Sequence, residues 1–350
     1  MTLADLARPD PLPETLMFSE AGEAGRAARA FLDRNRDTLE RIGQSLRAQP
    51  PKFVITCARG SSDHAATYAK YMIETHLGVP TASAALSVAS LYGVDLRGAD
   101  GLCIAISQSG RSPDLLTTVA ALKASGAFVV AIVNDETSPL AELADACLPL
   151  SAGPELSVAA TKSYITTLCA IAALTAAWAH NDELDEGLKS LPGALDRGFA
   201  RDWSAALPAL TEARNLFVIG RGYSFAAAQE AALKLKETCG IHAEAFSSAE
   251  VRHGPMAIVN DGFPILAFAA SDETGADVRA VCAEFAARGA DVYLAVAGEE
   301  IAPFPAQQGC PALEALPMVA SFYRLANAAA LARGLNPDAP PHLKKVTRTT

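Results

Sequence analysis

The sequence predicts an α/β protein with two tandem domains, each a doubly wound, Rossmann-like parallel sheet flanked by helices in a three-layer αβα arrangement. Three observations support this fold class. The chain has 350 residues, of which 50% are hydrophobic, and this is more than a typical single core needs. Short apolar runs alternate with helix-forming segments, which is the order found in parallel sheets. The order also occurs twice, which predicts two similar units in succession.

The first half of the chain shows the clearest alternation. Residues 16–46 have helical spacing of apolar side chains, and the double proline Pro50-Pro51 ends this region. Buried strands are predicted for three apolar runs, at residues 53–58, 101–106 and 128–133. Helices are predicted between and after them, at about 63–75, 113–125 and 161–180. Ser112 is expected as an N-cap, and a further strand is expected within 82–88.

The second half repeats the first. Arg221-Gly222 follows Arg59-Gly60 after 162 positions (221 − 59 = 162), and each pair separates a predicted strand from a predicted helix. In the second copy this helix is expected at about 224–237, with Ser224 as its N-cap and Gly240 just past its end.

The repeat sets the predicted domain boundaries. The expected parts are an N-terminal helical segment, two domains and a C-terminal tail, at residues 1–50, 51–190, 191–335 and 336–350. A linker is expected near 188–203, because Pro192, Gly193 and Gly198 cluster there.

The composition restricts the partners and the compartment. A net charge of −10 argues against nucleic acid and against anionic membrane surfaces. The seven cysteines form no C-x-x-C pair, which is typical of reduced thiols in a cytoplasmic protein. The N-terminus lacks signal-peptide features, and the longest apolar helical run, 168–179, is shorter than the roughly 20 residues of a membrane span. The six histidines show no metal-ligand spacing, so no metal or cofactor is predicted.

The first candidate site is the segment Ser107-Gln108-Ser109-Gly110-Arg111-Ser112, between a predicted strand and a predicted helix. Parallel α/β sheets bind ligands beyond the carboxyl ends of their strands. Free N–H groups and small hydroxyls at a helix N-terminus suit a dianionic phosphate, although a turn and a helix cap explain the same residues equally well. The corresponding segment of the second half, Ala270-Ser271-Asp272-Glu273, is acidic, so only the first half is expected to bind phosphate.

The second candidate site follows the helix of the second half. Lys234 and Glu237 share a helix face. A carboxylate near a helix C-terminus, where the dipole disfavours negative charge, suits a general base. His253 suits acid–base work near neutrality. The alternative is structural: Glu230 and Lys234 form an ordinary i,i+4 pair on a solvated helix, and a histidine before Gly-Pro is a turn residue.

A family resemblance favours the functional alternative at both sites. The stretch A-A-L-K-L-K-E-x-x-x-I-H-A-E-A at 231–245, followed by E-x-x-H-G-P at 250–255, resembles the isomerase unit of glutamine–fructose-6-phosphate amidotransferases, within the sugar isomerase (SIS) domain superfamily. The segment E-x-x-V-A-A-T-K at 155–162 resembles the family's E-x-x-V-A-S-T-K, with Ala160 in place of a serine. The tail at 340–347 resembles the family's closing N-L-A-K-S-V-T. Two tandem SIS domains are therefore implied over nearly the whole chain.

The resemblance also implies a role for each matching residue. The implied phosphosugar contacts are Ser61, Ser62, Ser107, Gln108, Ser109, Ser112 and the backbone around Val158. Glu237 is implied to move the proton between C1 and C2, and His253 to open the sugar ring. Lys234 would neutralise negative charge that develops on oxygen. Lys345 matches the lysine that forms an imine with the ketose, although Lys344 is adjacent to it.

The expected reaction follows from the same resemblance. The synthases carry a glutaminase domain with a cysteine after the initiator methionine, whereas this chain begins Met1-Thr2-Leu3. The expected net reaction is therefore glucosamine 6-phosphate plus water to fructose 6-phosphate plus ammonia, as in the stand-alone SIS-type glucosamine-6-phosphate deaminases. One alternative is a phosphosugar isomerase or an ammonia-dependent synthase, and another is a non-catalytic phosphosugar sensor. A homodimer with a shared site is also implied, since the related synthases take the histidine matching His253 from the neighbouring subunit.

Overall fold

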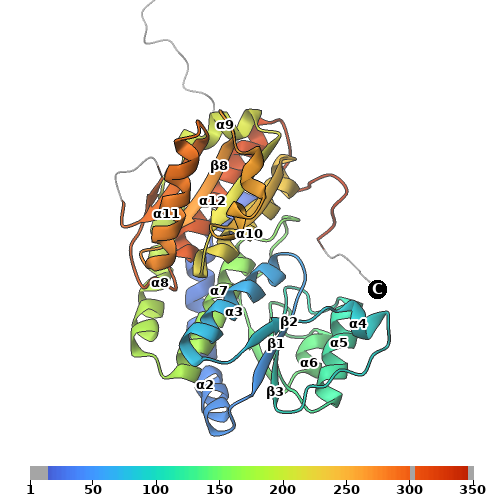
Figure 1. Cartoon of the computed structure of the whole chain (residues 1–350). Helices are drawn as coiled ribbons and strands as arrows, with labels where there is room; N and C mark the ends of the chain where they lie inside the picture. The colour runs from blue at the N-terminus through green and yellow to red at the C-terminus, as the bar shows by residue number, and fades with distance from the viewer. Residues whose placement is uncertain (1–14, 300–303, 346–350) are drawn as a thin grey trace, which may run out of the picture.

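Two five-stranded parallel sheets, one in each half of the chain, form the framework of the molecule (Figure 1). The structure is a computed structural model that describes residues 15–299 and 304–345. The sheets lie toward opposite ends of the molecule in Figure 1, and several long helices lie between them. The predicted fold class, two tandem α/β units with parallel sheets flanked by helices, is confirmed.

The first sheet has the strand order β2-β1-β3-β4-β5. Its strands are β1 (Phe53–Cys57), β2 (Thr81–Ser83), β3 (Gly101–Ser107), β4 (Phe128–Val133) and β5 (Ala146–Pro149). Successive side chains of a strand face opposite sides. On β3, Leu102 and Ile104 pack in the core shared with the second half, whereas Cys103 and Ala105 pack in a separate core. Both faces are buried, which explains why β3 reads as a continuous apolar run.

The second sheet has the strand order β10-β9-β8-β6-β7. Its strands are β6 (Asn215–Gly220), β7 (His242–Ser247), β8 (Pro264–Ala269), β9 (Asp291–Ala297) and β10 (Pro305–Ala306). The described part of the chain also contains short 3-10 helices, η1 (Ser204–Ala206), η2 (Glu250–Arg252) and η3 (Pro255–Ile258). In each sheet the strand order changes direction beside the first strand, β1 or β6. This change is where ligands of open α/β sheets bind.

Helices cover both sheets and fill the space between them. Those before and within the first unit are α1 (Leu16–Gly22), α2 (Ala24–Ala48), α3 (Ser61–Leu77), α4 (Ser87–Ser90), α5 (Pro113–Ala124), α6 (Pro139–Leu143) and α7 (Lys162–Ala179). Those that follow are α8 (Asp182–Ala200), α9 (Leu207–Glu212), α10 (Tyr223–Cys239), α11 (Glu273–Ala286) and α12 (Ala315–Ala332). Helix α3 follows β1 as α10 follows β6, and each has 17 residues and ends at a glycine in the left-handed conformation. Gly240 therefore ends α10, as predicted.

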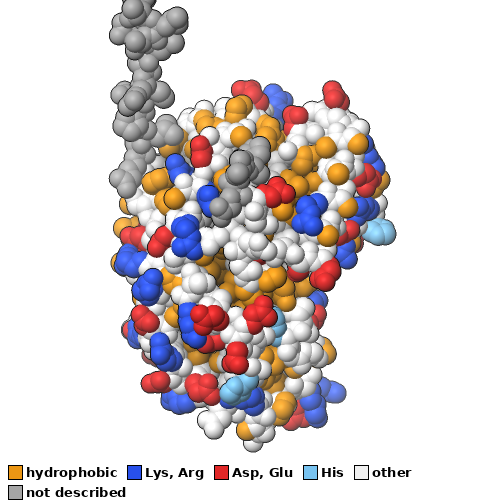
Figure 2. All heavy atoms as spheres, turned by 90° about the vertical axis from the view of Figure 1, so that its left-hand side faces the viewer, with side chains coloured by type: hydrophobic (Ala, Val, Ile, Leu, Met, Phe, Trp, Pro, Cys, Tyr) orange, Lys and Arg blue, Asp and Glu red, His pale blue; other side chains and the backbone are white. Residues whose placement is uncertain are grey.

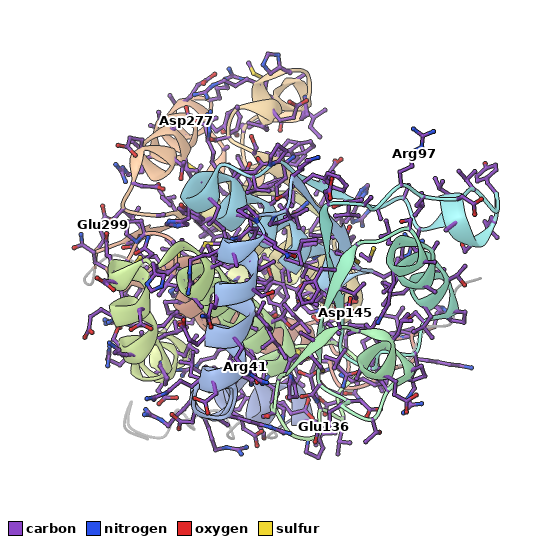
Figure 3. The ribbon with its side chains drawn as sticks, turned by 90° about the horizontal axis from the view of Figure 1, so that it is seen from below. Arg41, Arg97, Glu136, Asp145, Asp277 and Glu299 are labelled. Atoms are coloured by element: carbon purple, nitrogen blue, oxygen red, sulfur yellow. The ribbon has the colours of Figure 1, made fainter. Side chains whose placement is uncertain are left out.

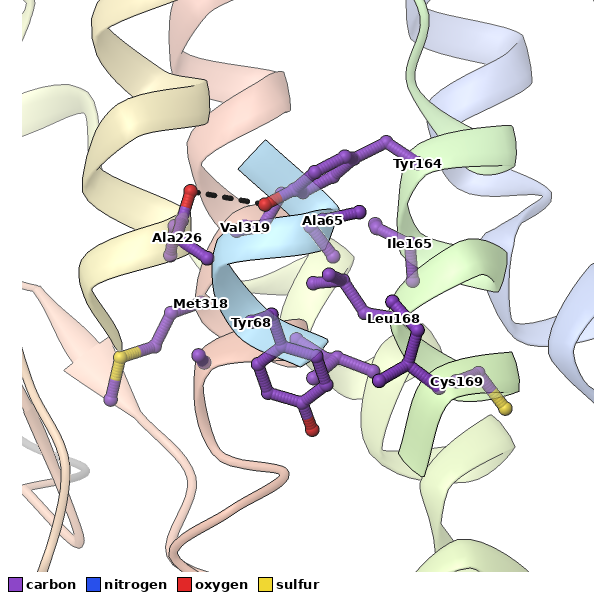
Figure 4. Close-up of a cluster of buried hydrophobic side chains, with 14 of the residues drawn as sticks. Ala65, Tyr68, Tyr164, Ile165, Leu168, Cys169, Ala226, Met318 and Val319 are labelled. Atoms are coloured by element: carbon purple, nitrogen blue, oxygen red, sulfur yellow. Dashed lines mark hydrogen bonds between the residues drawn. The ribbon is translucent and has the colours of Figure 1, made fainter. Parts of the chain in front are cut away.

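The two halves share one apolar core, centred on α7, α3, α10 and α12. Tyr164 and Leu168 of α7 lie near Tyr68 of α3 in this cluster (Figure 4). The Tyr164 hydroxyl donates a 3.0 Å hydrogen bond to the carbonyl oxygen of Ala226 on α10. Because one close-packed cluster includes residues of both units, the position of α3 against α10 is fixed by packing.

Three local predictions need correction. The strand expected within 82–88 is β2, Thr81–Ser83, because its ladder with β1 ends at the pair Thr56–Ser83. Ser224 is not an N-cap: α10 starts at Tyr223, and the Ser224 hydroxyl donates to the carbonyl oxygens of Arg221 and Phe268. The segment expected as a linker is largely helical, since α8 continues to Ala200 with Pro192 inside it. The domain boundaries themselves stay a prediction.

Many charged side chains lie on the outside of the molecule. The labelled side chains of Arg97, Glu136 and Glu299 lie at the periphery of the ribbon when it is seen from below (Figure 3). Acidic and basic groups are interspersed on the face shown in Figure 2. Among the described residues, no helix combines the length and the apolar character that crossing a membrane requires.

Candidate active site

The loop between β3 and α5 is held in a fixed shape by its own backbone and by its neighbours. The Ser107 hydroxyl accepts a 3.0 Å hydrogen bond from the Gly110 N–H. Gly110 has a φ of +63°, which a side chain would strain, and its carbonyl oxygen accepts from the Leu140 N–H at 3.3 Å. The Gln108 carbonyl oxygen accepts from the Asn134 N–H at 3.2 Å. The loop is therefore organised before any ligand arrives.

Two hydroxyls of this loop, those of Ser109 and Ser112, are free to bind a ligand. Ser112 is the N-cap residue of α5 as predicted, but its hydroxyl makes no capping hydrogen bond. Within the part of the chain that the structure describes, the hydroxyls of Ser62, Ser109 and Ser112 have no hydrogen-bond partner. Ser109 and Ser112 precede the 12-residue helix α5, whose N-terminal N–H groups and dipole favour an anion, whereas Ser62 lies in the first turn of α3.

Arg111 does not turn toward the serines of this loop. Its guanidinium forms an ion pair with Asp135, with 2.8 Å between Nη2 and Oδ2. Hydrogen bonds from Thr137 and Arg111 lower the pKa of Asp135 below its usual range. The arginine is exposed and fixes the neighbouring loop, so the free groups of the predicted phosphate site are hydroxyls, amides and backbone N–H groups.

A buried charged cluster occupies one face of α10. Lys234 Nζ lies 3.2 Å from Glu230 Oε1 and 2.5 Å from Glu237 Oε2. The side chains of Glu230 and Lys234 are 0% and 1% exposed, whereas that of Glu237 is 21% exposed. The interpretation of Glu230 and Lys234 as a pair on a solvated helix is therefore wrong. Glu237 is the member of the cluster that solvent or a ligand can reach.

The cluster keeps its charges because the burial costs are offset within it. Burial alone would lower the pKa of Lys234, but the negative charges of Glu230 and Glu237 outweigh this effect and raise that pKa. Burial alone would raise the pKa of Glu230, but the Lys234 charge and a hydrogen bond from His64 outweigh it and lower that pKa. Lys234 is therefore an ammonium at neutral pH, suited to stabilising negative charge on oxygen and not to nucleophilic attack.

Residues of the first half complete this cluster. The Ser61 hydroxyl on α3 donates to Glu230 Oε1 at 3.1 Å and lies 3.2 Å from Lys234 Nζ. His64, one turn further along α3, lies 3.1 Å from Glu230 Oε2 through Nδ1. The Tyr323 hydroxyl on α12 donates to Glu230 Oε1 at 3.0 Å. Ser61, which the sequence implied as a sugar contact, therefore belongs to the charged cluster at the junction of the two halves.

The C-terminal tail reaches a second buried carboxylate. Lys345 Nζ forms a 2.9 Å ion pair with Glu155 Oε2. Burial alone would raise the pKa of Glu155, but Lys345 and hydrogen bonds that include the Thr161 N–H and the Ser163 hydroxyl lower it. The neighbouring Lys344 is exposed. The Val158 N–H donates to a tail carbonyl oxygen, that of Asp338, at 3.0 Å, so this backbone donor is already paired.

His253 stands apart from the other predicted catalytic residues. It follows η2 in a turn, where its own N–H donates to the Glu250 carbonyl oxygen at 2.9 Å. The residue is exposed, and among the described residues its imidazole contacts neither Glu237 nor Lys234. One chain thus brings Lys234 and Glu237 together, and it does not bring His253 to them.

Nothing else in the described chain competes as a chemical centre. Residues 15–299 and 304–345 contain no group of three or more His, Cys, Asp or Glu side chains that could hold a metal ion. A surface cavity of about 780 Å³ between α2, α7 and α8 contains none of the predicted site residues. Charged and apolar side chains of these helices line it together, so the cluster on α10 is the candidate chemical centre.

The comparison with known families decides which family this architecture represents. The model of the SIS domain matches residues 49–177 and again residues 209–308, so it covers both sheets. The chain belongs to the SIS domain family.

Individual relatives agree with the SIS assignment. A glutamine–fructose-6-phosphate aminotransferase (isomerizing) from Symbiobacterium thermophilum is 34% identical over 94% of this chain and 58% of its own length. A solved structure of a protein proposed to be a phosphosugar isomerase, from Silicibacter pomeroyi DSS-3, is 42% identical with a TM-score of 0.87, over 93% of this chain and 100% of that one. A glucosamine-6-phosphate deaminase from Thermotoga maritima, 24% identical with a TM-score of 0.77 over 96% of this chain and 100% of that one, shares the fold. The chain spans a little over half the length of the curated relatives it matches.

Sequence reasoning missed three residues of this SIS site. Glu155 lies in the E-x-x-V-A-A-T-K segment, which predicts no role for it, and the sequence predicts no role for His64 or Tyr323. His64 follows Ser61 at helical spacing, i,i+3, so a shared face of α3 was a usable signal. Tyr323 lies in an apolar helix, and nothing in its sequence context distinguishes it from a core tyrosine.

Proposed function

We propose that the protein is a phosphosugar aldose–ketose isomerase that releases an amine, converting glucosamine 6-phosphate and water to fructose 6-phosphate and ammonia. The observation that carries the proposal is the buried cluster of Lys234, Glu230 and Glu237, in a SIS protein whose β3–α5 loop presents free hydroxyls at a helix N-terminus. A fixed ammonium next to a partly exposed carboxylate suits proton transfer beside a carbonyl group.

In this proposal the phosphate is held by the first half. Ser109, Ser112 and the backbone N–H groups before α5 form hydrogen bonds to its oxygens. The sugar then extends toward α10, with Ser62 as a contact on the way. Binding the phosphate fixes C1 and C2 of the open-chain sugar against the base, and such positioning accounts for a large part of many rate enhancements.

The chemistry at C1 and C2 falls to the second half. Glu237 takes the proton from C2 of the open-chain aldose and returns it to C1. The Lys234 ammonium stabilises the negative charge that develops on O1 as the enolamine forms. A 2-amino aldose isomerised in this way carries an imine at C2. Hydrolysis of that imine consumes water and releases ammonia, so isomerisation leads to amine release without any nitrogen donor.

Lys345 is proposed to take part in this hydrolysis. Its amine adds to C2 of the imine and ammonia leaves, and water then adds to the lysine imine and releases the ketose phosphate and the free amine. The Lys345 ammonium is paired with the buried Glu155 carboxylate, which can accept a proton when the amine attacks and return it afterwards. The 2.9 Å contact supports Lys345 over Lys344 for this role, because a nucleophilic lysine needs a nearby group that takes its proton.

His253 is proposed to open the sugar ring from the second subunit of a homodimer. This placement accounts for an exposed imidazole that its own chain leaves away from Glu237. Complementation tests it: His253→Ala chains are mixed with Ser109→Ala/Glu237→Gln chains after mild dissociation. Mixed dimers should regain activity, because half of their sites would contain intact Ser109, Glu237 and His253. Mixed dimers that form without any regain would contradict the shared site.

The reaction itself is tested with a panel of 6-phosphosugars, including glucosamine, galactosamine, fructose and glucose 6-phosphates. Ammonia and ketose phosphate are measured together, with the Glu237→Gln variant as the control for contaminating enzymes. Equal amounts of both products from a hexosamine phosphate support the proposal. If the protein interconverts only phosphosugars that lack an amino group, it is an isomerase without amine release. Net consumption of added ammonia would make it a synthase, and binding without turnover would make it a sensor.

A further inference from the structure

We propose that His64 is a positioning residue: through Glu230 it holds the Lys234 ammonium against Glu237, and so couples the sugar-binding end of α3 to the catalytic face of α10. The inference rests on the proposed function for its catalytic consequence, but its geometric part stands on contacts within the chain. His64 lies in the first turns of α3, and its Nδ1 is 3.1 Å from Glu230 Oε2.

The hydrogen bonds of Glu230 are divided unequally between its two oxygens. Oε1 receives three donors, from Ser61, Tyr323 and Lys234, at 3.1, 3.0 and 3.2 Å. Oε2 receives one, and within the described residues that donor is His64. Because the side chain of Glu230 is 0% exposed, water cannot easily replace a lost donor. His64 is therefore the single support of one oxygen of a buried carboxylate.

The consequence for Lys234 follows from competition between two carboxylates. Its ammonium is closer to Glu237, at 2.5 Å, than to Glu230, at 3.2 Å. An unsupported Oε2 is a strong acceptor in a buried site, so it should draw the ammonium toward Glu230 and away from Glu237. The His64 N–H keeps that oxygen occupied and leaves the ammonium where charge develops on the substrate.

The position of His64 on α3 explains why this contact joins two functions. Ser61 and His64 are separated by one helical turn and lie on the same face, and both contact Glu230. Ser62, the proposed sugar contact, lies between them in the sequence. A displacement of the start of α3 by a bound sugar would therefore be felt at Glu230, and through Glu230 at Lys234.

The test compares His64→Ala with His64→Asn, because the asparagine Nδ2 can place an N–H near the position of the imidazole Nδ1. His76→Asn is the matched control, since His76 is also on α3 and half-buried but contacts Asn181 and Tyr223 at 3.3 and 3.4 Å. His64→Ala should lower kcat by about 10²-fold, the effect of a misplacement of about 1 Å, with KM nearly unchanged. His64→Asn should recover most of the activity, and His76→Asn should match the wild type.

Crystal structures of the same variants separate this inference from the proposed function. In His64→Ala the distance from Lys234 Nζ to Glu237 Oε2 should exceed hydrogen-bond range, and in His64→Asn it should return. A 2.5 Å contact that persists in His64→Ala overturns the inference, whatever the activity. A wild-type kcat in His64→Ala overturns it as well. A wild-type protein that turns over no phosphosugar refutes the proposed function, and the crystal structures then decide the positioning role alone.

Discussion

The helices α3 and α10 are equivalent elements of the two halves, yet the three charged residues of the buried cluster all lie on α10. Both have 17 residues, and both start after a glycine with a φ of +59°. On α10 the cluster consists of Glu230, Lys234 and Glu237. The equivalent positions of α3, 162 residues earlier, are uncharged: Tyr68, Met72 and Thr75. The same backbone therefore carries a buried charged cluster in one half and uncharged side chains at the equivalent positions in the other.

The loops before α5 and α11 also differ, because a side chain caps the N-terminus of α11 but not that of α5. Before α5 the Ser112 hydroxyl makes no capping bond. Before α11 the Asp272 carboxylate accepts from the N–H groups of Thr274 and Gly275 at 3.0 and 3.1 Å. An internal carboxylate thus occupies the position that an anion would need in the second half. The duplicated fold therefore has two equivalent helix N-termini, one without a side-chain cap and the other capped by a carboxylate.

The largest expected effect is the loss of kcat when Glu237, the proposed base on α10, is replaced. Glu237→Gln should lower kcat by about 10²–10⁴-fold, because the amide keeps the shape of the side chain and cannot accept a proton. Deuterium incorporation from solvent at C1 of the ketose product should be lost in parallel. Thr75→Val changes the equivalent residue of α3 and should leave the rate unaltered. Exchange at the wild-type rate in Glu237→Gln would assign the base to another residue.

The two helix N-termini should respond oppositely to alanine. Ser112→Ala removes a hydrogen bond to a charged phosphate, worth roughly 1.5–3 kcal/mol, so KM should rise roughly 10- to 100-fold with kcat and thermal stability nearly intact. Asp272→Ala removes a helix cap and should lower the free energy of unfolding by about 0.5–2 kcal/mol with KM unchanged. Steady-state kinetics and urea unfolding measure both. An equal loss of stability in the two variants would mean that Ser112 is only a cap.

The glycines before α3 and α10 allow the two halves to be compared by alanine substitution at equivalent backbone positions. Gly60 and Gly222 share φ values of +59° and ψ values of −132° and −131°, so alanine is strained at both, by about 1–3 kcal/mol. A Cβ at Gly222 would lie 2.8 Å from the Thr274 side chain, whereas a Cβ at Gly60 meets nothing within 4 Å. Gly222→Ala should therefore reduce the free energy of unfolding more than Gly60→Ala. If urea titrations show a greater loss of unfolding free energy for Gly60→Ala than for Gly222→Ala, the added Cβ at residue 60 must clash with a neighbour.

The smallest expected effect is a change in the acid stability of the protein. The pKa of Glu230 is lowered in the folded state, so its stabilisation is fully present above its unfolded pKa, near 4.5, and is lost as pH falls through the folded value. The free energy of unfolding of Glu230→Gln should fall less steeply than that of the wild type below about pH 4.5. Tyr68→Phe, at the equivalent position of α3, should keep the wild-type slope. If the free energy of unfolding depends on pH equally in all three proteins, Glu230 does not contribute to acid stability.

Much of the fold was predictable because strands and their glycine turns are local signals. The apolar runs at 53–58 and 101–106 became β1 and β3, and the interval between Arg59-Gly60 and Arg221-Gly222 marked the repeat. The extent of β2 was not predictable, since it depends on how many residues pair with β1 across the sheet. The helical character of the segment near Pro192 was not predictable either, because a proline within a helix is tolerated only where packing compensates for the lost hydrogen bond.

The sequence by itself determined the residue types and helix positions of the site, including Lys234 and Glu237 on one face of α10. Only the tertiary structure decided that Glu230 and Lys234 are buried, because burial depends on α3 and α12, which are distant in sequence. The tertiary structure also paired Lys345 with Glu155 across 190 residues and left His253 outside the cluster. The charges and their helical spacing are set by the local sequence. The low-dielectric environment of these charges is created only when distant helices exclude water.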